Sequence, residues 1–240
     1  MKKFLSLLYQ PSCDNCKVTT INRGLCSKCY SKIIFAMNNY CNKCGFYYKD
    51  IGFQGLCANC VGNEYYFDSI DYCVVYNDMV YSLIHQFKNH DSLHLKVLLS
   101  SFLIDKIRKA LNLQEVDIII PVPIHYFKLF LRQYNHMSIL GNYIAKQLNM
   151  EINNLALYKT RYTKMQKLLK LSMRLKNLKQ SFSCNKKYRK IIENKTILLI
   201  DDVITTGTTV NECAKVLKKY GAKEVKVLSF ARVDGILKCV

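Results

Sequence analysis

The chain contains no run of 18 or more apolar residues, and this absence argues against a membrane-spanning helix. The opening stretch MKKFLSLLYQPSC places a short apolar patch after two lysines, as a signal peptide does. That patch stops at Tyr9, and no small-residue cleavage site precedes the first cysteines. We therefore expect a cytoplasmic protein. Half of the 240 residues are hydrophobic, which is enough for one sizeable core and a small additional module.

Acidic residues are missing from one long stretch. The chain has 36 Lys and Arg against 17 Asp and Glu, a net charge of +19, yet the window Lys159–Lys190 holds twelve basic residues and no acidic one. A nucleotide bias in the genome raises lysine everywhere, but it does not by itself empty such a window of carboxylates. A concentrated positive field attracts phosphate, on a small molecule or on a nucleic acid.

Eight of the twelve cysteines form four Cys-x-x-Cys pairs within the first 60 residues. Two such turns complete a tetrahedral zinc shell of four thiolates, and Gly24 and Gly45 stand where tight turns need glycine. Four disulfides would require an oxidising compartment, and a redox Cys-x-x-Cys motif usually occurs once. We predict one or two structural zinc ions; we favour an ion shared by neighbouring pairs, with alternate pairs as the other possibility. The predicted ligands are Cys13, Cys16, Cys26, Cys29, Cys41, Cys44, Cys57 and Cys60.

The pattern divides the chain into a cysteine-rich zinc ribbon module over 1–62 and a second domain over 63–240. In the second domain, apolar runs alternate with helical periodicity, which predicts an α/β fold: a mainly parallel sheet flanked by helices. We expect strands at 67–77, 116–123, 155–158, 197–200 and 224–231, and helices at 78–90, 93–111 and 208–220.

The stretch ILLIDDVITTGTT places two carboxylates, Asp201 and Asp202, at the end of a buried strand. The turn 205–209 follows and leads into a helix; its backbone N–H groups, hydroxyls and Gly207 suit a phosphate monoester, although it is not a Walker A loop. The acids suit sugar hydroxyls or hydrated Mg²⁺. A phosphorylated sugar fits this pattern; the alternative is a turn in which Asp and Thr serve only as caps.

The same stretch resembles the phosphoribosyl-pyrophosphate (PRPP) signature of type I phosphoribosyltransferases. That resemblance implies that the two acids bind the ribose 2′ and 3′ hydroxyls and that the turn holds the 5′-phosphate, with magnesium on the pyrophosphate. The residues implied to bind PRPP are Asp201, Asp202, Val203, Thr205, Thr206, Gly207, Thr208 and Thr209.

IIPVPIH followed by RQYNH, the block KTRYTKMQKLLKLSMRLKNLKQSF, the cysteine-rich start and Lys88 resemble ComF-type (ComFC) competence proteins. Three positions depart from that pattern: Lys159 where Arg is common, and Gln133 and His136 in place of Gly and Gln. The resemblance implies a flexible loop over the pyrophosphate, formed with Val122, Lys159, Arg161, Lys164 and Gln166. Residues assigned to nucleic-acid contact are Arg132, Lys164, Lys167, Lys170 and Arg174.

Two functions follow from these resemblances. One is a PRPP-binding competence protein that handles incoming single-stranded DNA in natural transformation, with a DNA-uptake helicase and membrane uptake machinery as implied partners. The other is an active, Mg-dependent phosphoribosyltransferase that transfers phosphoribosyl to a nucleobase or amine and releases pyrophosphate. A third idea, a PRPP-sensing regulator, lacks a helix-turn-helix signature. No dedicated general base emerges from the sequence.

Overall fold

The computed structural model describes residues 10–36, 40–47, 55–88, 92–110, 115–132, 134–160 and 181–233. Within these ranges no helix is both long enough and apolar enough to cross a membrane. The sequence-based expectations for Gln133 and for the basic residues between 161 and 180 lie outside the described residues.

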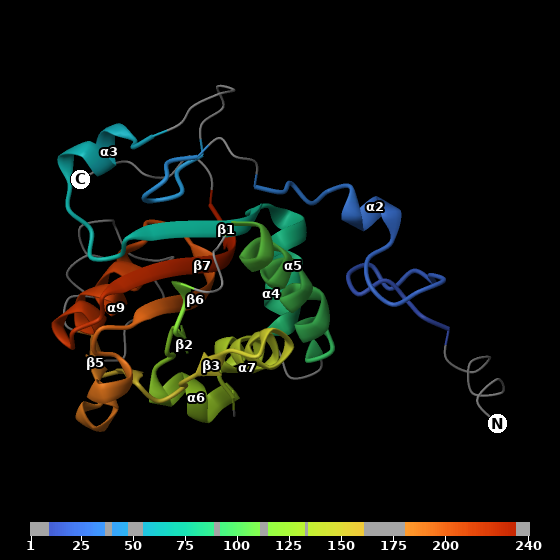
Figure 1. Cartoon of the computed structure of the whole chain (residues 1–240). Coiled ribbons are helices and arrows are strands. Elements are labelled where there is room, and N and C mark those ends of the chain that lie inside the picture. The colour runs from blue at the N-terminus through green and yellow to red at the C-terminus, as the bar shows by residue number, and fades with distance from the viewer. Residues whose placement is uncertain are drawn as a thin grey trace.

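A five-stranded parallel sheet forms the centre of the second domain (Figure 1). Its order is β1-β7-β6-β2-β3, and every neighbouring pair runs parallel. The strands are β1 (Ser69–Val75), β2 (Ile118–Pro121), β3 (Glu151–Ile152), β6 (Thr196–Ile204) and β7 (Glu224–Arg232). The central strands are continuous apolar runs because both faces of the sheet are covered, so the predicted architecture is confirmed.

Helices cover both faces of the sheet. Residues of α4 (Asp78–Phe87), α5 (Leu95–Ala110) and α7 (His136–Leu148) share one hydrophobic cluster with one face, and α9 (Thr208–Lys219) packs in a second cluster on the other. Each helix buries one apolar stripe, as the 3.6-residue periodicity predicts. Asn77 and Asn135 cap α4 and α7 by accepting backbone N–H bonds.

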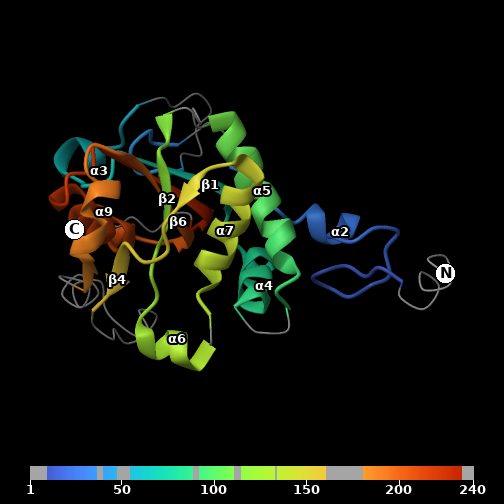
Figure 2. The ribbon, with the colours of Figure 1, turned by 60° about the horizontal axis from the view of Figure 1, so that its bottom comes forward.

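Smaller elements complete the second domain. Helix α6 (Tyr126–Arg132) follows β2 and stands away from the sheet (Figure 2). The strands β4 (Leu157–Lys159) and β5 (Phe182–Cys184) pair antiparallel, and the 3₁₀ helix η4 (Lys186–Ile191) follows them. The pairing brings Lys159 and Phe182, which lie on either side of residues 160–181, next to each other.

The N-terminal module consists of two ribbons at separate places on the molecule. The first contains α2 (Ser27–Tyr30) and lies beside α4, whereas the second contains α3 (Ala58–Gly62) and lies near β1 (Figures 1 and 2). Gly24 and Gly45 adopt φ values of 127° and 68°, which confirms the prediction that these turns need glycine. Between the ribbons, backbone bonds join Ile34 and Ala36 to β1, so the first ribbon is tied to the sheet edge.

Strand β6 is longer than the sequence predicts. Apolar character ends at Ile200, but the strand continues to Ile204 because Asp201 and Val203 stay in register with β7. The two acids therefore lie on the last part of a rigid strand rather than in a loop after it. Three of the cysteines outside the pairs, Cys73, Cys184 and Cys213, are buried.

Candidate functional site

A cavity of about 660 Å³ opens at the carboxyl edge of the parallel sheet. Tyr76, Val122 and Val233 line it directly after β1, β2 and β7, and the segment after β6 forms its floor. Ligands of parallel α/β sheets bind at this edge. The lining residues are Tyr76, Tyr81, Ile84, His85, Lys88, Val122, Ile124, His136, Met137, Asp201, Asp202, Val203, Ile204, Thr205, Thr206, Gly207, Thr208, Thr209, Val210 and Val233.

The turn after β6 is shaped for an anion. Gly207 has φ 72° and is the N-cap of α9, and it provides no side chain to cap the first N–H groups of that helix. Thr206 Oγ1 and Thr208 Oγ1 lie 2.8 Å apart and border the same turn. Uncapped N–H groups, hydroxyls and the helix dipole are features that favour an anion.

Asp202 is held by three donors. Its Oδ1 accepts the N–H of Val203 at 2.6 Å, its Oδ2 lies 2.9 Å from His136 Nε2, and Lys88 Nζ pairs with the same Oδ2. Burial opposes ionisation of this carboxyl, but Lys88 and His136 outweigh it and hold the pKa of Asp202 below its usual range. Asp202 is therefore a fixed, ionised carboxylate.

Asp201 has a different environment from its neighbour. Its Oδ1 accepts the N–H of Asp202 at 2.9 Å. Burial and the negative charge of Asp202 raise the pKa of Asp201 to about 7, although Lys88 and Lys159 oppose the shift. Near neutral pH the pair thus carries less than two full negative charges, and a cation bound beside it would favour ionisation of Asp201.

The structure brings all eight residues of the predicted PRPP set into this one cavity, together with Val122. Lys159 is not among the residues that line the cavity. It ends β4, with its Nζ 5.3 Å from the centre of the Phe182 ring, and its charge lowers the pKa of Asp201. Arg132 lies at the end of α6. The expected loop residues Arg161, Lys164 and Gln166, with Lys167, Lys170 and Arg174, lie outside the described residues.

Several cavity residues were missing from the predicted site. Tyr81, Ile84, His85 and Lys88 come from α4 and its C-cap, and the sequence of this helix shows only an ordinary amphipathic pattern. His136 was noticed as a departure from the family pattern, but its contact with Asp202 crosses 66 positions of sequence. Lys88 was noted only as part of the family resemblance, and the sequence assigns it no role beside the acid pair.

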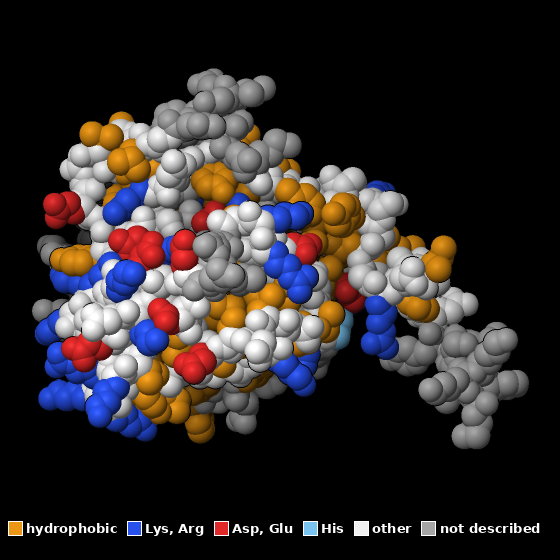
Figure 3. All heavy atoms as spheres, in the orientation of Figure 1, with side chains coloured by type: hydrophobic (Ala, Val, Ile, Leu, Met, Phe, Trp, Pro, Cys, Tyr) orange, Lys and Arg blue, Asp and Glu red, His pale blue; other side chains and the backbone are white. Residues whose placement is uncertain are grey.

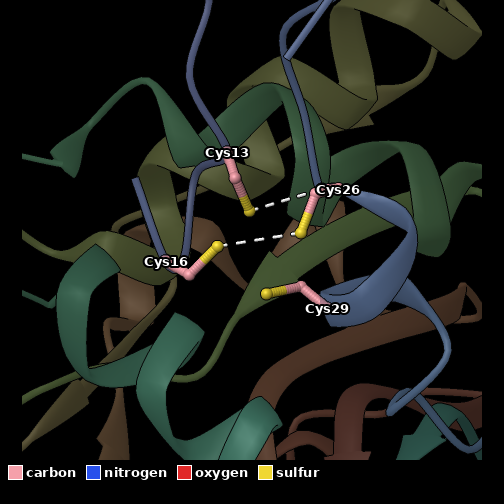
Figure 4. A group of neighbouring side chains, drawn as sticks. All are labelled: Cys13, Cys16, Cys26 and Cys29. Carbon is pink, nitrogen blue, oxygen red and sulfur yellow. Dashed lines mark hydrogen bonds between the residues drawn. The ribbon is translucent and has the colours of Figure 1, made fainter. Parts of the chain in front are cut away.

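The eight paired cysteines form two compact groups, 13/16/26/29 and 41/44/57/60, in each of which the sulfur atoms all lie within 4.8 Å of one another. Neighbouring pairs thus share a site, as the sequence favours (Figure 4 shows the first group). The N–H groups of Cys26 and Cys57 lie 3.3 Å from the sulfurs of Cys13 and Cys41. These are zinc-binding sites of four cysteines each, with the donor set and backbone N–H···S bonds that zinc knuckles use.

The first cysteine of each ribbon favours thiolate. Burial alone would raise the pKa of Cys13, but the N–H groups of Cys26, Cys16 and Asn15 lower it to about 6. Hydrogen bonding from Cys44, together with backbone N–H groups, lowers the pKa of Cys41 to about 4 against the effect of burial. Because zinc binds thiolate, the ribbon backbone is arranged for the metal-bound form.

Two family models match different parts of the chain. The family described as "Double zinc ribbon domain" matches residues 4–63, and "Phosphoribosyl transferase domain" matches residues 139–234. Competence protein F of Haemophilus influenzae is 30% identical, over 92% of this chain and 96% of that protein. DNA utilization protein YhgH of Escherichia coli strain K12 is 27% identical, over 87% and 90%.

Two further similarities are partial. Competence protein ComFC of Streptococcus pneumoniae is 55% identical over 38 residues, 16% of this chain and 17% of that protein. A purine phosphoribosyltransferase from Pyrococcus horikoshii aligns over 58% of this chain and 75% of that one, at 18% identity and a TM-score of 0.37.

The fold, the acid pair and the Thr/Gly turn define a phosphoribosyltransferase-like domain, and the paired cysteines define a double zinc ribbon. The similarity to Competence protein F spans both modules and nearly the full length of that protein. The chain belongs to the ComF family of competence proteins.

Proposed function

We propose that this ComF-type protein binds PRPP with Mg²⁺ in the cavity and handles incoming single-stranded DNA during natural transformation. One observation carries the first part: the adjacent carboxylates Asp201 and Asp202 and the turn 205–209 line a single cavity at the carboxyl end of β6. A ligand with a phosphate at one end and vicinal hydroxyls in the middle matches this order of groups.

Each part of the site has a task in this proposal. The N–H groups and hydroxyls around Gly207 bind the 5′-phosphate, and the acid pair accepts the ribose hydroxyls. The charges of Lys88 and Lys159, both close enough to act on Asp201, stabilise the pyrophosphate end. Magnesium, when bound with PRPP, neutralises the charge of the pyrophosphate. The chain itself positions the ligand and surrounds it with fixed charges.

The nucleic-acid part of the proposal rests on α6 and on the charge of the chain. This helix follows β2 just after Val122 and Ile124, which line the cavity, and it exposes large apolar side chains: Tyr126 is 70% exposed and Phe130 is 75% exposed. Bases of single-stranded DNA stack on such rings while basic residues contact phosphates. The segment 159–190, with its twelve basic residues, adds positive charge to the chain. Two relatives carry the words "DNA utilization" and "Competence" in their names.

An active phosphoribosyltransferase is the second candidate. It is favoured by the aromatic wall that Tyr76, Tyr81 and His85 form on the α4 side of the cavity, where the Tyr81 and His85 rings lie 5.5 Å apart. A flat nucleobase is the acceptor that such a wall would hold. Pyrophosphate release from PRPP upon addition of nucleobases or amines tests this candidate, with single-stranded DNA present and absent.

Titration calorimetry of Mg-PRPP tests the main proposal. We expect the double variant Asp201→Asn/Asp202→Asn to lose about 100-fold in affinity, because it replaces both carboxyl groups, including the ionised Asp202, by neutral amides. Asp117→Asn is the matched control, since Asp117 precedes β2 at the opposite edge of the sheet and pairs with Lys195 there. Equal affinity of the double variant and the wild type would refute the proposal, as would folded, zinc-loaded wild type that does not bind PRPP.

Fluorescence anisotropy with a labelled single-stranded oligonucleotide tests the DNA part. Tyr126→Ser/Phe130→Ser should weaken binding about tenfold or more, the loss expected for one or two stacked bases. Tyr30→Ser, at an exposed aromatic residue of the first ribbon, should leave binding unchanged. The affinity should also fall steeply with salt, and a salt-independent affinity would contradict the electrostatic part.

A further inference from the structure

Helix α4 is a wall shared by the PRPP cavity and the first zinc ribbon. Its residues Tyr81 and His85, with Lys88 at its C-cap, line the cavity. On another side of the same helix, Ser82 and Gln86 hydrogen-bond to the ribbon. Positions four apart lie on one face of a helix, so Ser82 and Gln86 form a single contact surface.

Asn15 connects that surface to the first zinc site. Its Oδ1 accepts from Ser82 Oγ at 2.8 Å and from Gln86 Nε2 at 3.3 Å, and its Nδ2 lies 3.5 Å from the sulfur of Cys29. Gln86 Nε2 also donates to Ser82 Oγ at 3.1 Å. The Asn15 amide therefore has one end on a zinc-binding thiolate and the other on α4 (Figure 4 shows the thiolates).

The first ribbon also contacts the start of α4. Asn77, which caps this helix, donates its Nδ2 to the backbone oxygen of Lys32 at 2.9 Å. Ile34 then accepts the N–H of Val75 just before the helix begins. The ribbon thus holds α4 near both of its ends.

The carboxyl end of α4 leads directly to the acid pair. Lys88 is the C-cap residue, two positions after Gln86, and its ammonium group pairs with Asp202 Oδ2. Lys88 and His136 are the groups that keep Asp202 ionised and oriented. A shift in the last turn of α4 changes the place of this ammonium group in the cavity.

We propose that the first zinc ribbon positions Lys88, through Asn15 and α4, and that PRPP affinity therefore depends on an intact first zinc site. The inference rests on the proposed binding of PRPP. Zinc holds the Cys29 thiolate against the Asn15 amide, and without it the knuckle that presents Asn15 is not maintained. Lys88 then leaves its place beside Asp202, and the cavity loses a positive charge next to an anionic ligand.

Calorimetric titration of Mg-PRPP into three variants tests this coupling. Asn15→Ala removes the link itself, and Ser82→Ala/Gln86→Met removes both donors to Asn15 without changing the ribbon. Tyr40→Phe is the matched control: it removes a hydroxyl by which the second ribbon contacts Asp71 at 2.9 Å and Lys106 at 2.7 Å, on the β1 and α5 side. Zinc content and circular dichroism are recorded for every sample.

We expect both α4-side variants to bind PRPP about fivefold or more weakly, the lower end of typical coupling between sites, while Tyr40→Phe stays within about twofold of the wild type. If Asn15→Ala fails to fold or to retain zinc, the Ser82/Gln86 variant decides alone. Unchanged or tighter binding in the folded Ser82/Gln86 variant overturns the inference, as does equal weakening by Tyr40→Phe. Wild type that binds no PRPP overturns the proposed function as well.

Partial zinc depletion supplies a second readout. Cys16 of the first site is exposed, whereas all four cysteines of the second are buried, so a mild chelator should release the first zinc ion before the second. PRPP affinity should fall together with loss of the first ion. Affinity that survives loss of that ion in a folded protein contradicts the coupling.

Discussion

The two zinc ribbons have the same cysteine spacing within each pair but meet the rest of the molecule in different ways. In the first ribbon Cys16 is exposed and Ile21 is 93% exposed, and the ribbon stands out from the side of the molecule beside α4 (Figure 3). In the second, all four cysteines are buried and belong to the hydrophobic cluster of β6, β7 and α9. The same motif is thus partly exposed in the first ribbon and fully buried in the second.

This difference separates two kinds of contribution. The first ribbon contacts α4 through hydrogen bonds, which fix the position of groups, and through Cys13, Cys29 and Ile33, which pack in the hydrophobic cluster that contains α4. The second ribbon contributes buried surface and lies beside the buried Arg232. We therefore expect changes in the second ribbon to lower the free energy of unfolding, and changes in the first to alter ligand affinity.

The largest expected effect is loss of a ligand from the second zinc site. Cys44→Ser should destabilise the protein by about 4 kcal/mol or more, because loss of a metal site belongs to the most damaging classes of substitution and this site lies in the core. Cys16→Ser, at the exposed ligand of the first site, should cost less than about 3 kcal/mol. Thermal unfolding with zinc analysis measures both, and a greater loss for Cys16→Ser would reverse the comparison.

Arg232 provides the next test. Its side chain is 3% exposed; burial lowers the pKa of this guanidinium, and nearby Cys44 is the largest opposing influence. A zinc ion bound by four thiolates carries a net charge of about −2, so the guanidinium compensates a buried negative charge. Arg232→Met should cost about 3 kcal/mol by leaving that charge uncompensated.

Lys226→Met, on the same strand as Arg232, is the matched control. Lys226, whose side chain is 12% exposed, pairs with Glu115 and Glu224. Those carboxylates are 55% and 34% exposed and stay solvated without it, so its loss should cost no more than about 1 kcal/mol. Urea unfolding of the two variants separates the cases. Equal destabilisation by the two substitutions would show that Arg232 does not stabilise the protein by compensating the charge of the zinc site.

The knuckle glycines give a smaller difference between the ribbons. Both have positive φ, but a Cβ on Gly45 would lie 2.9 Å from the backbone oxygen of Ile70, whereas a Cβ on Gly24 would meet nothing within 4 Å. Gly24→Ala should therefore cost the backbone strain alone, about 1–3 kcal/mol, and Gly45→Ala should cost more because β1 must also move. Chemical denaturation of the two variants checks the order.

Much of this architecture could be predicted from local pattern. The central strands β2 and β6 appear in the sequence as continuous apolar runs, and the cysteine pairs predict the zinc ribbons. Asp201, Asp202 and Gly207 are close together in the sequence, and all three line the cavity. These features are determined by residues that are close together in the sequence, so they can be predicted from it. Even so, β6 extends past its apolar run because pairing with β7 continues through Asp201.

What the sequence does not reveal is which distant surfaces meet. His136 and Lys88 converge on Asp202 from two helices, and Asn15 finds α4 across 67 and 71 positions of sequence. The Cys-x-x-Cys spacing, which is the same within all four pairs, does not distinguish the partly exposed ribbon from the buried one. That distinction depends on tertiary packing, because the extent to which a short ribbon is buried depends on the part of the protein surface against which it packs.

Asn77 offers the finest test of the first ribbon's polar attachment. Asn77→Asp keeps the oxygen that accepts the N–H of Val80 and caps α4, but it replaces the Nδ2 that donates to Lys32. The cap survives, so the unfolding free energy should fall by no more than about 1 kcal/mol, the net worth of one exposed hydrogen bond. Asn135→Asp, at the cap of α7, makes the same change where the described side-chain contact is only the capping bond to Met137. If the first ribbon positions α4, PRPP affinity measured by calorimetry should fall for Asn77→Asp and stay the same for Asn135→Asp. The melting temperatures of the two variants should agree. Equal PRPP affinities of the two variants would limit the ribbon's influence to the Asn15 contact.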